Sequence, residues 1–201
     1  MDEEEGDDAP PPPYLVWRRG QLTDGICKTD EPDGVPSWRD LDEGKPLRAT
    51  WPDSVTSTMS ARFPRDTGLA DALYNTYIVV SARVKSFLEE AGVPDVELLP
   101  LAICDHAGAI ASRDYFIVHP TSIVECLDDE ASEAERSKDG TVRGVAQLVL
   151  RDEALPSSHP VFRLARWPSR IIIRRDLAEA MEAAGLTGLG FLEPESYDGL
   201  I

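Results

Sequence analysis

Two cysteines and two histidines in the second half of the chain are side chains that could together bind a zinc ion. They are Cys104, His106, His119 and Cys126. Structural zinc sites usually take their ligands in close pairs, with two to four residues between cysteines and three to five between histidines. Neither spacing occurs in this set. The spacing therefore disfavours zinc.

The strands expected to carry these residues also hold them apart. Residues 98–104 and 114–119 are expected to pair as a hairpin, which places Cys104 opposite Tyr115 or its neighbour. His119 then lies on the order of 10 Å further along, at ~3.4 Å per residue. Ligands at ~2.0–2.3 Å from one ion cannot be that far apart. We predict no metal site and no other cofactor.

The same side chains could supply a cysteine nucleophile and a histidine base. Cys104 and Cys126 both lie in apolar segments. Burial raises the pKa of a thiol and makes it unreactive, and a small buried side chain is the usual role of a free cysteine. The many carboxylates include no pair that stands out as an acid and base couple. We predict that the protein is not an enzyme.

Residues 185–190, with the sequence Gly-Leu-Thr-Gly-Leu-Gly, resemble a phosphate-binding loop only in composition. Such a loop must follow a strand and open a helix, because the N–H groups at the start of a helix bind the phosphate. Here the glycines follow a predicted helix, and its negative end repels phosphate. We reject this motif.

Five arginines lie between residues 161 and 175, where the chain has no acid. They are Arg163, Arg166, Arg170, Arg174 and Arg175, with Trp167 among them. Arginines interleaved with an aromatic ring can bind phosphate or bases. They can equally pair with the many acids of the chain. The first alternative would make the protein a module that binds a small anionic ligand, or a regulatory module, through the Arg163–Arg175 strip.

The pattern along the chain predicts an α+β fold with a mixed, mainly antiparallel sheet of six to eight strands and two principal amphipathic helices. Residues 14–70 are rich in loops, and residues 71–201 hold the core. Strands are expected at 14–17, 77–80, 96–104, 115–118, 123–127, 145–150, 161–165 and 171–173. Residues 128–141 are charged and polar, which predicts a mobile loop.

Both helices carry start and stop signals. The first is expected to be capped by Ser81, to bury Val84, Phe87, Leu88 and Ala91, and to end at Gly92 with Val93 folding back on Leu88. The second is expected to open with a capping box of Asp176 and Glu179. Its apolar stripe is Leu177, Met181 and Ala184.

Charge is the unusual property of this 201-residue chain, because 37 acids against 20 bases give a net charge of −17. Such a surface repels nucleic acid and attracts a basic partner. Residues 1–13 hold six acids and Pro10–Pro13, which predicts a solvated tail before a single domain over 14–201. Three cysteines, an acidic N-terminus and no long apolar run favour a reduced cytoplasm and no membrane contact. The sequence does not decide between monomer and homodimer.

The order of several segments resembles a bacterial immunity-protein family, family eleven, encoded beside polymorphic toxins. The resemblance covers about residues 77–194 and is weak over the first 70. It is carried by residues 79–81, 87–101, 114–120, 124–128, 161–164 and 186–191. Asp114-Tyr115-Phe116-Ile117-Val118-His119-Pro120 matches a strand in which asparagine usually stands in place of His119. These motifs are strand edges, caps and turns.

The resemblance implies a role rather than a site. Members of the family bind and neutralise a cognate toxin in the cytoplasm of the cell that produces it. The acidic chain suits a basic toxin, which it would cover by protein–protein contact. We expect the contacts to include exposed acids of the predicted loop and two tryptophans as anchors, namely Asp128, Asp129, Glu130, Glu133, Glu135, Trp38 and Trp51. The tryptophans could instead pin the loop-rich part onto the core.

Overall fold

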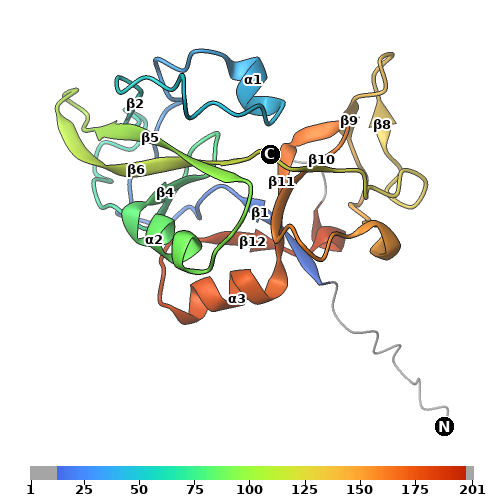
Figure 1. The fold of residues 1–201 in the computed structure, drawn as a ribbon. Helices are drawn as coiled ribbons and strands as arrows, with labels where there is room; N and C mark the ends of the chain where they lie inside the picture. The colour runs from blue at the N-terminus through green and yellow to red at the C-terminus, as the bar shows by residue number, and fades with distance from the viewer. Residues whose placement is uncertain (1–12, 198–201) are drawn as a thin grey trace, which may run out of the picture.

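The computed structural model describes residues 13–197, which form two five-stranded sheets, a small hairpin and three α-helices (Figure 1). Sheet one has the order β12-β1-β11-β10-β7. Its strands are β1 (Tyr14–Arg18), β7 (Ile123–Val124), β10 (Val161–Leu164), β11 (Trp167–Arg174) and β12 (Gly190–Leu192). All neighbours are antiparallel except β10 and β7.

Sheet two has the order β2-β5-β6-β4-β3. Its strands are β2 (Thr56–Thr58), β3 (Ala72–Leu73), β4 (Val79–Ser81), β5 (Val96–Cys104) and β6 (Ile110–Pro120). Only β2 and β5 are parallel. The hairpin joins β8 (Glu135–Arg136) to β9 (Val142–Gly144). The predicted α+β class with mainly antiparallel strands is confirmed, although the strands form two sheets where one was expected.

The helices are α1 (Trp38–Asp42), α2 (Ala82–Glu90) and α3 (Arg175–Ala183), and two short 3-10 turns are η1 (Asp152–Ala154) and η2 (Pro194–Ser196). The two principal helices, α2 and α3, pack against different sheets: α2 against β4 and β6, and α3 against β11 and β1. Within residues 13–197 no helix combines the length and the apolar character that crossing a bilayer requires.

Three apolar cores hold these layers together. The first joins the two sheets under α2 and α3, the second lies between sheet two and residues 26–59, and the third lies on the other face of sheet one. β1 serves two of them because side chains alternate along a strand. Leu15 and Trp17 face the first core, and Tyr14 and Val16 face the third. This double burial explains why β1 is apolar without interruption.

α2 ends as the sequence predicts, but it begins differently. Gly92 adopts φ 63°, and the Val93 amide donates to the carbonyl oxygen of Leu88 at 3.1 Å, which closes the helix. Ser81 occupies the N-cap position, but its hydroxyl donates to the Asp71 carboxylate at 2.7 Å and caps nothing. Ala91, expected in the buried stripe, is exposed.

Asp71 draws the Ser81 hydroxyl away from the cap because its buried carboxylate binds several donors. It also accepts hydrogen bonds from the Thr187 amide at 2.9 Å and from Arg83 at 2.8 Å. Burial alone would raise the pKa of Asp71, but the hydrogen bonds from Thr187 and Ser81 and the charge of Arg83 outweigh it and lower the pKa. Asp71 thereby fastens the chain after α3 to the start of α2.

The predicted capping box of α3 is wrong. The N-cap residue is Arg174, which makes no capping hydrogen bond, and Asp176 lies inside the helix. Asp176 instead pairs with Arg174 at 2.6 Å. The buried stripe contains Leu177 and Met181 as predicted, with Ala178 in place of the exposed Ala184. The motif occurs once in this segment, at Asp176 and Glu179, but β11 pairs with β1 as far as Arg174 and the helix begins directly after it.

Three other predictions change. Residues 145–150 form no strand, and Leu150 makes only an isolated bridge to Leu127. The strand predicted over 123–127 is limited to β7. In the β5/β6 hairpin, Cys104 lies opposite Ile110 and not opposite Tyr115, which pairs with Leu101, because the register shifts twice near the turn. The tail predicted over 1–13 lies almost entirely outside the described residues.

Candidate functional site

The acidic residues predicted to contact a partner lie on one excursion from sheet one. Between β7 and β10 the chain leaves the sheet over residues 125–160, which include the β8/β9 hairpin. Figure 1 shows this hairpin on the opposite side of the molecule from the β5/β6 turn. Apolar side chains of the excursion, among them Leu127, Val142 and Leu148, are buried in the third core beside β10. The segment predicted to be a mobile loop therefore contains a hairpin and is packed on the sheet.

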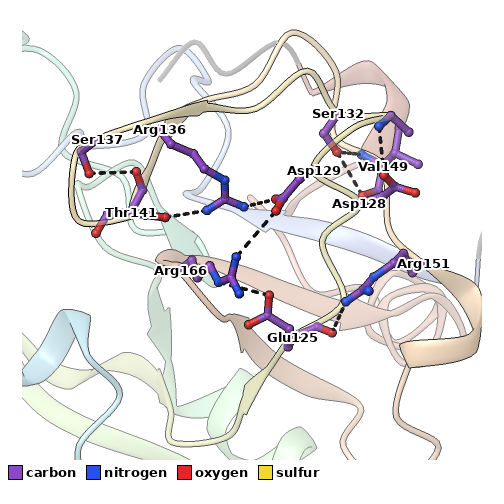
Figure 2. Close-up of polar contacts among 12 residues, drawn as sticks. Glu125, Asp128, Asp129, Ser132, Arg136, Ser137, Thr141, Val149, Arg151 and Arg166 are labelled. Carbon is purple, nitrogen blue, oxygen red and sulfur yellow. Dashed lines mark hydrogen bonds and ion pairs between the residues drawn. The ribbon is translucent and has the colours of Figure 1, made fainter.

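Ser132 organises the base of the excursion. It is fully buried, and its hydroxyl donates to the Val149 carbonyl at 3.2 Å and accepts from the Val149 amide at 2.9 Å. Asp128 folds the turn that precedes it, since its carboxylate accepts from the Ala131 amide at 2.9 Å. Figure 2 shows Asp128 and Ser132 in hydrogen-bond contact with Val149. Asp128 thus has a structural role in the turn while its side chain remains half-exposed.

Asp129 is neutralised within the protein. Arg136 forms an ion pair with one carboxylate oxygen of Asp129, and Arg166 lies 3.7 Å from the other (Figure 2). Arg166 also pairs with Glu125 at 3.3 Å. These contacts tie the β8/β9 hairpin to the turn between β10 and β11. A basic partner would have to compete with two arginines for Asp129.

The remaining acids of the predicted set face solvent. Glu130, Glu133 and Glu135 are exposed, and their side chains form no hydrogen bond or ion pair with any residue between 13 and 197. We call these three residues the glutamate triplet. Glu133 adopts φ 48°, a conformation unusual for a residue other than glycine. The triplet therefore offers unpaired negative charge from a packed support.

The two tryptophans lie elsewhere and are tied to the second core. Trp38 stacks on Tyr77 with ring centroids 5.3 Å apart and planes inclined by 18°. The Trp51 indole donates to the carbonyl oxygen of Pro100 at 2.8 Å. Both rings are half-buried against sheet two, so each pins the loop-rich part and also leaves some surface to solvent. They do not lie on the excursion that carries the glutamate triplet.

The cysteines and histidines considered for zinc or nucleophilic chemistry are dispersed. Cys104 lies at the turn end of β5, whereas His119 pairs with Glu97 at the other end of the strand. Cys126 is buried in the third core, and this burial raises the pKa of its thiol to about 12. His106 is exposed and contacts the Phe63 carbonyl at 3.2 Å. Within residues 13–197 no three potential ligands gather as a metal site would require.

His119 and Arg163 form a buried polar pair that the sequence did not reveal. Arg163 is 2% exposed and donates to the carbonyls of Pro120 at 2.9 Å and Pro168 at 2.6 Å. Its third contact is His119 Nδ1 at 3.2 Å, while His119 Nε2 donates to the Lys45 carbonyl at 2.7 Å. Burial lowers the pKa of both side chains, that of Arg163 to about 10. His119 is therefore neutral and holds its proton on Nε2.

The five arginines between 163 and 175 do not form one strip. Arg163 is buried, Arg166 holds the excursion, and Arg174 pairs with Asp176. Arg175 makes a two-pronged contact with Glu193, at 2.8 and 2.5 Å. Arg170 differs from these four, since its guanidinium lies 4.7 Å from the Trp167 ring and 5.5 Å from that of Tyr197. Alternation along β10 and β11 disperses the group, as it does any run of strand residues.

Sequence reasoning found the exposed acids of the excursion but missed the residues that hold it. Ser132 and Arg136 stand in a polar stretch where nothing marks them as partners of Val149 and Asp129. One signal was available: Asp128 precedes Ala131 by three residues, and aspartate at the first position of a turn commonly binds the backbone in this way.

A family of known proteins is similar to this protein over nearly the whole chain. The model of a family described as an immunity protein family, Imm11, matches residues 4–196. The similarity therefore extends well before residue 77, where the sequence resemblance was expected to begin. No curated protein matches the chain.

Proposed function

Because the chain belongs to the Imm11 immunity protein family, we propose that it binds a cognate antibacterial toxin and neutralises it by covering it one-to-one, without catalytic turnover. The match over residues 4–196 is the observation that carries this proposal. Neutralisation takes place in the cytoplasm of the cell that makes both proteins, since that is where the toxin would act on its producer.

Electrostatics support a basic toxin as the partner. The net charge of −17 creates a negative field that speeds encounter with a positive surface. Unpaired exposed carboxylates are the groups able to contact such a surface without first breaking an internal ion pair. The same field disfavours direct binding of nucleic acid, whose phosphates are repelled.

The glutamate triplet is the part of the predicted contact set that best suits this role. Its three carboxylates are free of partners among residues 13–197, and the excursion that carries them is packed on sheet one. A rigid support lowers the entropy lost on binding. Asp128 and Asp129 stabilise the support, and the exposed edges of Trp38 and Trp51 would add contact only with a toxin large enough to reach sheet two.

Co-expression with the toxin gene next to this one tests the proposal. The triple variant Glu130→Lys, Glu133→Lys, Glu135→Lys is compared with Glu90→Lys, Glu179→Lys, Glu182→Lys. The second set replaces three exposed glutamates on α2 and α3 that lack ion pairs within residues 13–197. Both variants change the net charge equally, so they separate the local contact from the overall field. We expect the first to lose rescue of growth and co-purification, and the second to retain both.

A titration of purified toxin with purified protein tests the mode of action. One-to-one covering predicts that toxin activity falls linearly and reaches its minimum at equimolar protein. Inhibition by a small fraction of an equivalent would contradict covering and indicate an enzymatic antidote. Equal loss of binding in both triple variants would support the field and contradict the glutamate triplet as the contact.

A further inference from the structure

A cavity of about 270 Å³ lies at the end of β1, where residues of both sheets line it. Its walls come from the end of β1, from β11, from the segment before β4, and from β6 and α1. Apolar and aromatic side chains form most of the lining, with Trp17 and Tyr77 among them. A largely apolar hollow with a few polar groups directed to it is the usual form of a small-molecule site.

Three arginines are brought to this cavity by strand register and chain direction. The pairing of β1 with β11 ends at Trp17 opposite Ile171, and the next residue on each strand, Arg18 and Arg170, lines the cavity. Arg19 follows directly, and its guanidinium lies 4.3 Å from the ring of Tyr74. Like charges facing each other across neighbouring strands destabilise a sheet. An arrangement of this kind calls for a compensating negative group.

The protein does not supply that group from its described part. Arg163 and Asp42 also line the cavity. The negative charge of Asp42 compensates the charge of Arg163 and favours its protonated form. Arg18, Arg19 and Arg170 form no ion pair with any residue between 13 and 197, although the chain carries 37 acids. The cavity is therefore a positive site within a strongly negative molecule.

Two donors at the cavity also lack an acceptor. Trp17 is 3% exposed, and its indole Nε1 has no hydrogen-bond partner among the described residues. The Nε of Arg170 is likewise buried and unpartnered there. A buried N–H without an acceptor destabilises the folded protein. An acceptor delivered by a ligand would remove this destabilisation.

We propose that the cavity binds a small molecule that carries an oxyanion, either a carboxylate or a phosphate, on an aromatic or aliphatic body. The oxyanion lies beside Arg18 and Arg170, and the apolar body lies against Trp17 and Tyr77, all four of which line the cavity. Charge-assisted hydrogen bonds from guanidinium to carboxylate or phosphate are among the strongest that a protein forms. This site is separate from the glutamate triplet, and its occupation does not depend on toxin binding.

Binding of four probes to the full-length protein, measured by calorimetry, tests the proposal. Phenyl phosphate and benzoate each carry body and oxyanion, inorganic phosphate carries the oxyanion alone, and benzyl alcohol carries the body alone. We expect at least one of the first two to bind at least about tenfold more tightly than either of the last two. Whichever of the two binds more tightly identifies the oxyanion. The indole N–H signal of Trp17, assigned by its loss in Trp17→Phe, is expected to move on binding.

Substitution of the arginines locates the ligand. Arg18→Gln and Arg170→Gln are each expected to weaken binding about tenfold or more, as loss of one charged hydrogen bond implies. Arg113→Gln removes an exposed arginine at the far end of β6 and is expected to change nothing. The Arg18 side chain makes no hydrogen bond, ion pair or ring contact within residues 13–197, so its variant should fold normally. Equal binding by all three variants, or equal binding of benzyl alcohol, would overturn the proposal and leave the toxin-binding proposal untouched.

Discussion

Single residues show how burial changes the meaning of a charged side chain. In the sequence Arg163 is one of five neighbouring arginines. In the structure its guanidinium donates hydrogen bonds to two backbone carbonyls and to His119. Removing such a group would leave several acceptors without partners, which makes it a structural residue. The same burial fixes His119 in the neutral form, so that its Nδ1 can accept and its Nε2 can donate.

The pair predicts a pH dependence of stability. The pKa of His119 is lower in the folded protein than its ordinary value of about 6.5, so the unfolded chain binds a proton first as the pH falls. The contribution is therefore complete above pH ~6.5 and is lost below it, at no more than about 1.4 kcal/mol per pH unit. Chemical denaturation between pH 8 and 5 measures this slope.

Two variants separate His119 from other titrating groups. His119→Asn keeps one donor and one acceptor but cannot titrate, and we expect it to flatten the slope between pH 6.5 and 5. His106→Gln removes an exposed histidine and is expected to leave the slope as it was. An unchanged slope in His119→Asn would show that another group is responsible.

At the scale of elements, the sequence indicated helices and long strands more reliably than their ends. The stop of α2 at Gly92 and Val93 depends on neighbours along the chain, and the prediction is confirmed. The start of α3 depends on β11, which pairs with β1 and β10 and ends at Arg174. The helix therefore begins at the next residue, Arg175. Local sequence contains no information on that pairing.

The candidate site follows the same division. The exposed acids could be named from composition, since a polar stretch with turn residues lies at the surface. The contacts that hold the excursion in place could not be predicted from the sequence. They join positions far apart in the chain, Ser132 with Val149 and Asp129 with Arg166. That Arg18 and Arg170 line one cavity depends in the same way on the pairing of β1 with β11.

The uncapped start of α3 predicts a stabilising substitution. Arg174 occupies the N-cap with φ −67° and ψ 136°, which suits serine, and its present ion pair with Asp176 is largely exposed. The amides of Arg175 and Leu177 already donate to the Pro13 carbonyl and to the Asp176 carboxylate, so Arg174→Ser would supply an acceptor for the Asp176 amide between them. We expect Arg174→Ser to exceed Arg174→Ala in free energy of unfolding by about 0.5–2 kcal/mol. Equal stability of the two variants would place the true start of the helix elsewhere.

The whole molecule carries a charge that works against its own compactness. A net charge of −17 repels itself within a structure in which 9 of the 20 bases form ion pairs. The same charge opposes association of like copies, and it would attract the basic partner proposed above. Stability and binding therefore respond to salt in opposite directions.

Salt is expected to stabilise the isolated protein. Raising NaCl from 10 to 150 mM shortens the screening length from about 30 to about 8 Å and weakens the repulsion between distant carboxylates. A gain of about 1 kcal/mol would raise the melting temperature by about 2–4 °C at this chain length. The variant with lysine at all three positions of the glutamate triplet is six charges less negative and should gain less. A falling melting temperature would mean that surface ion pairs outweigh the repulsion.

The position of β1 in sheet one also determines when folding of that sheet can be completed during synthesis. Residues 14–18 leave the ribosome before every other strand of the two sheets, but the residues with which they pair, in β11 and β12, are made more than 150 residues later. Sheet two is complete by residue 120 and can assemble while synthesis continues. The first strand must wait with both edges unpaired, so a chain truncated before β12 cannot complete sheet one.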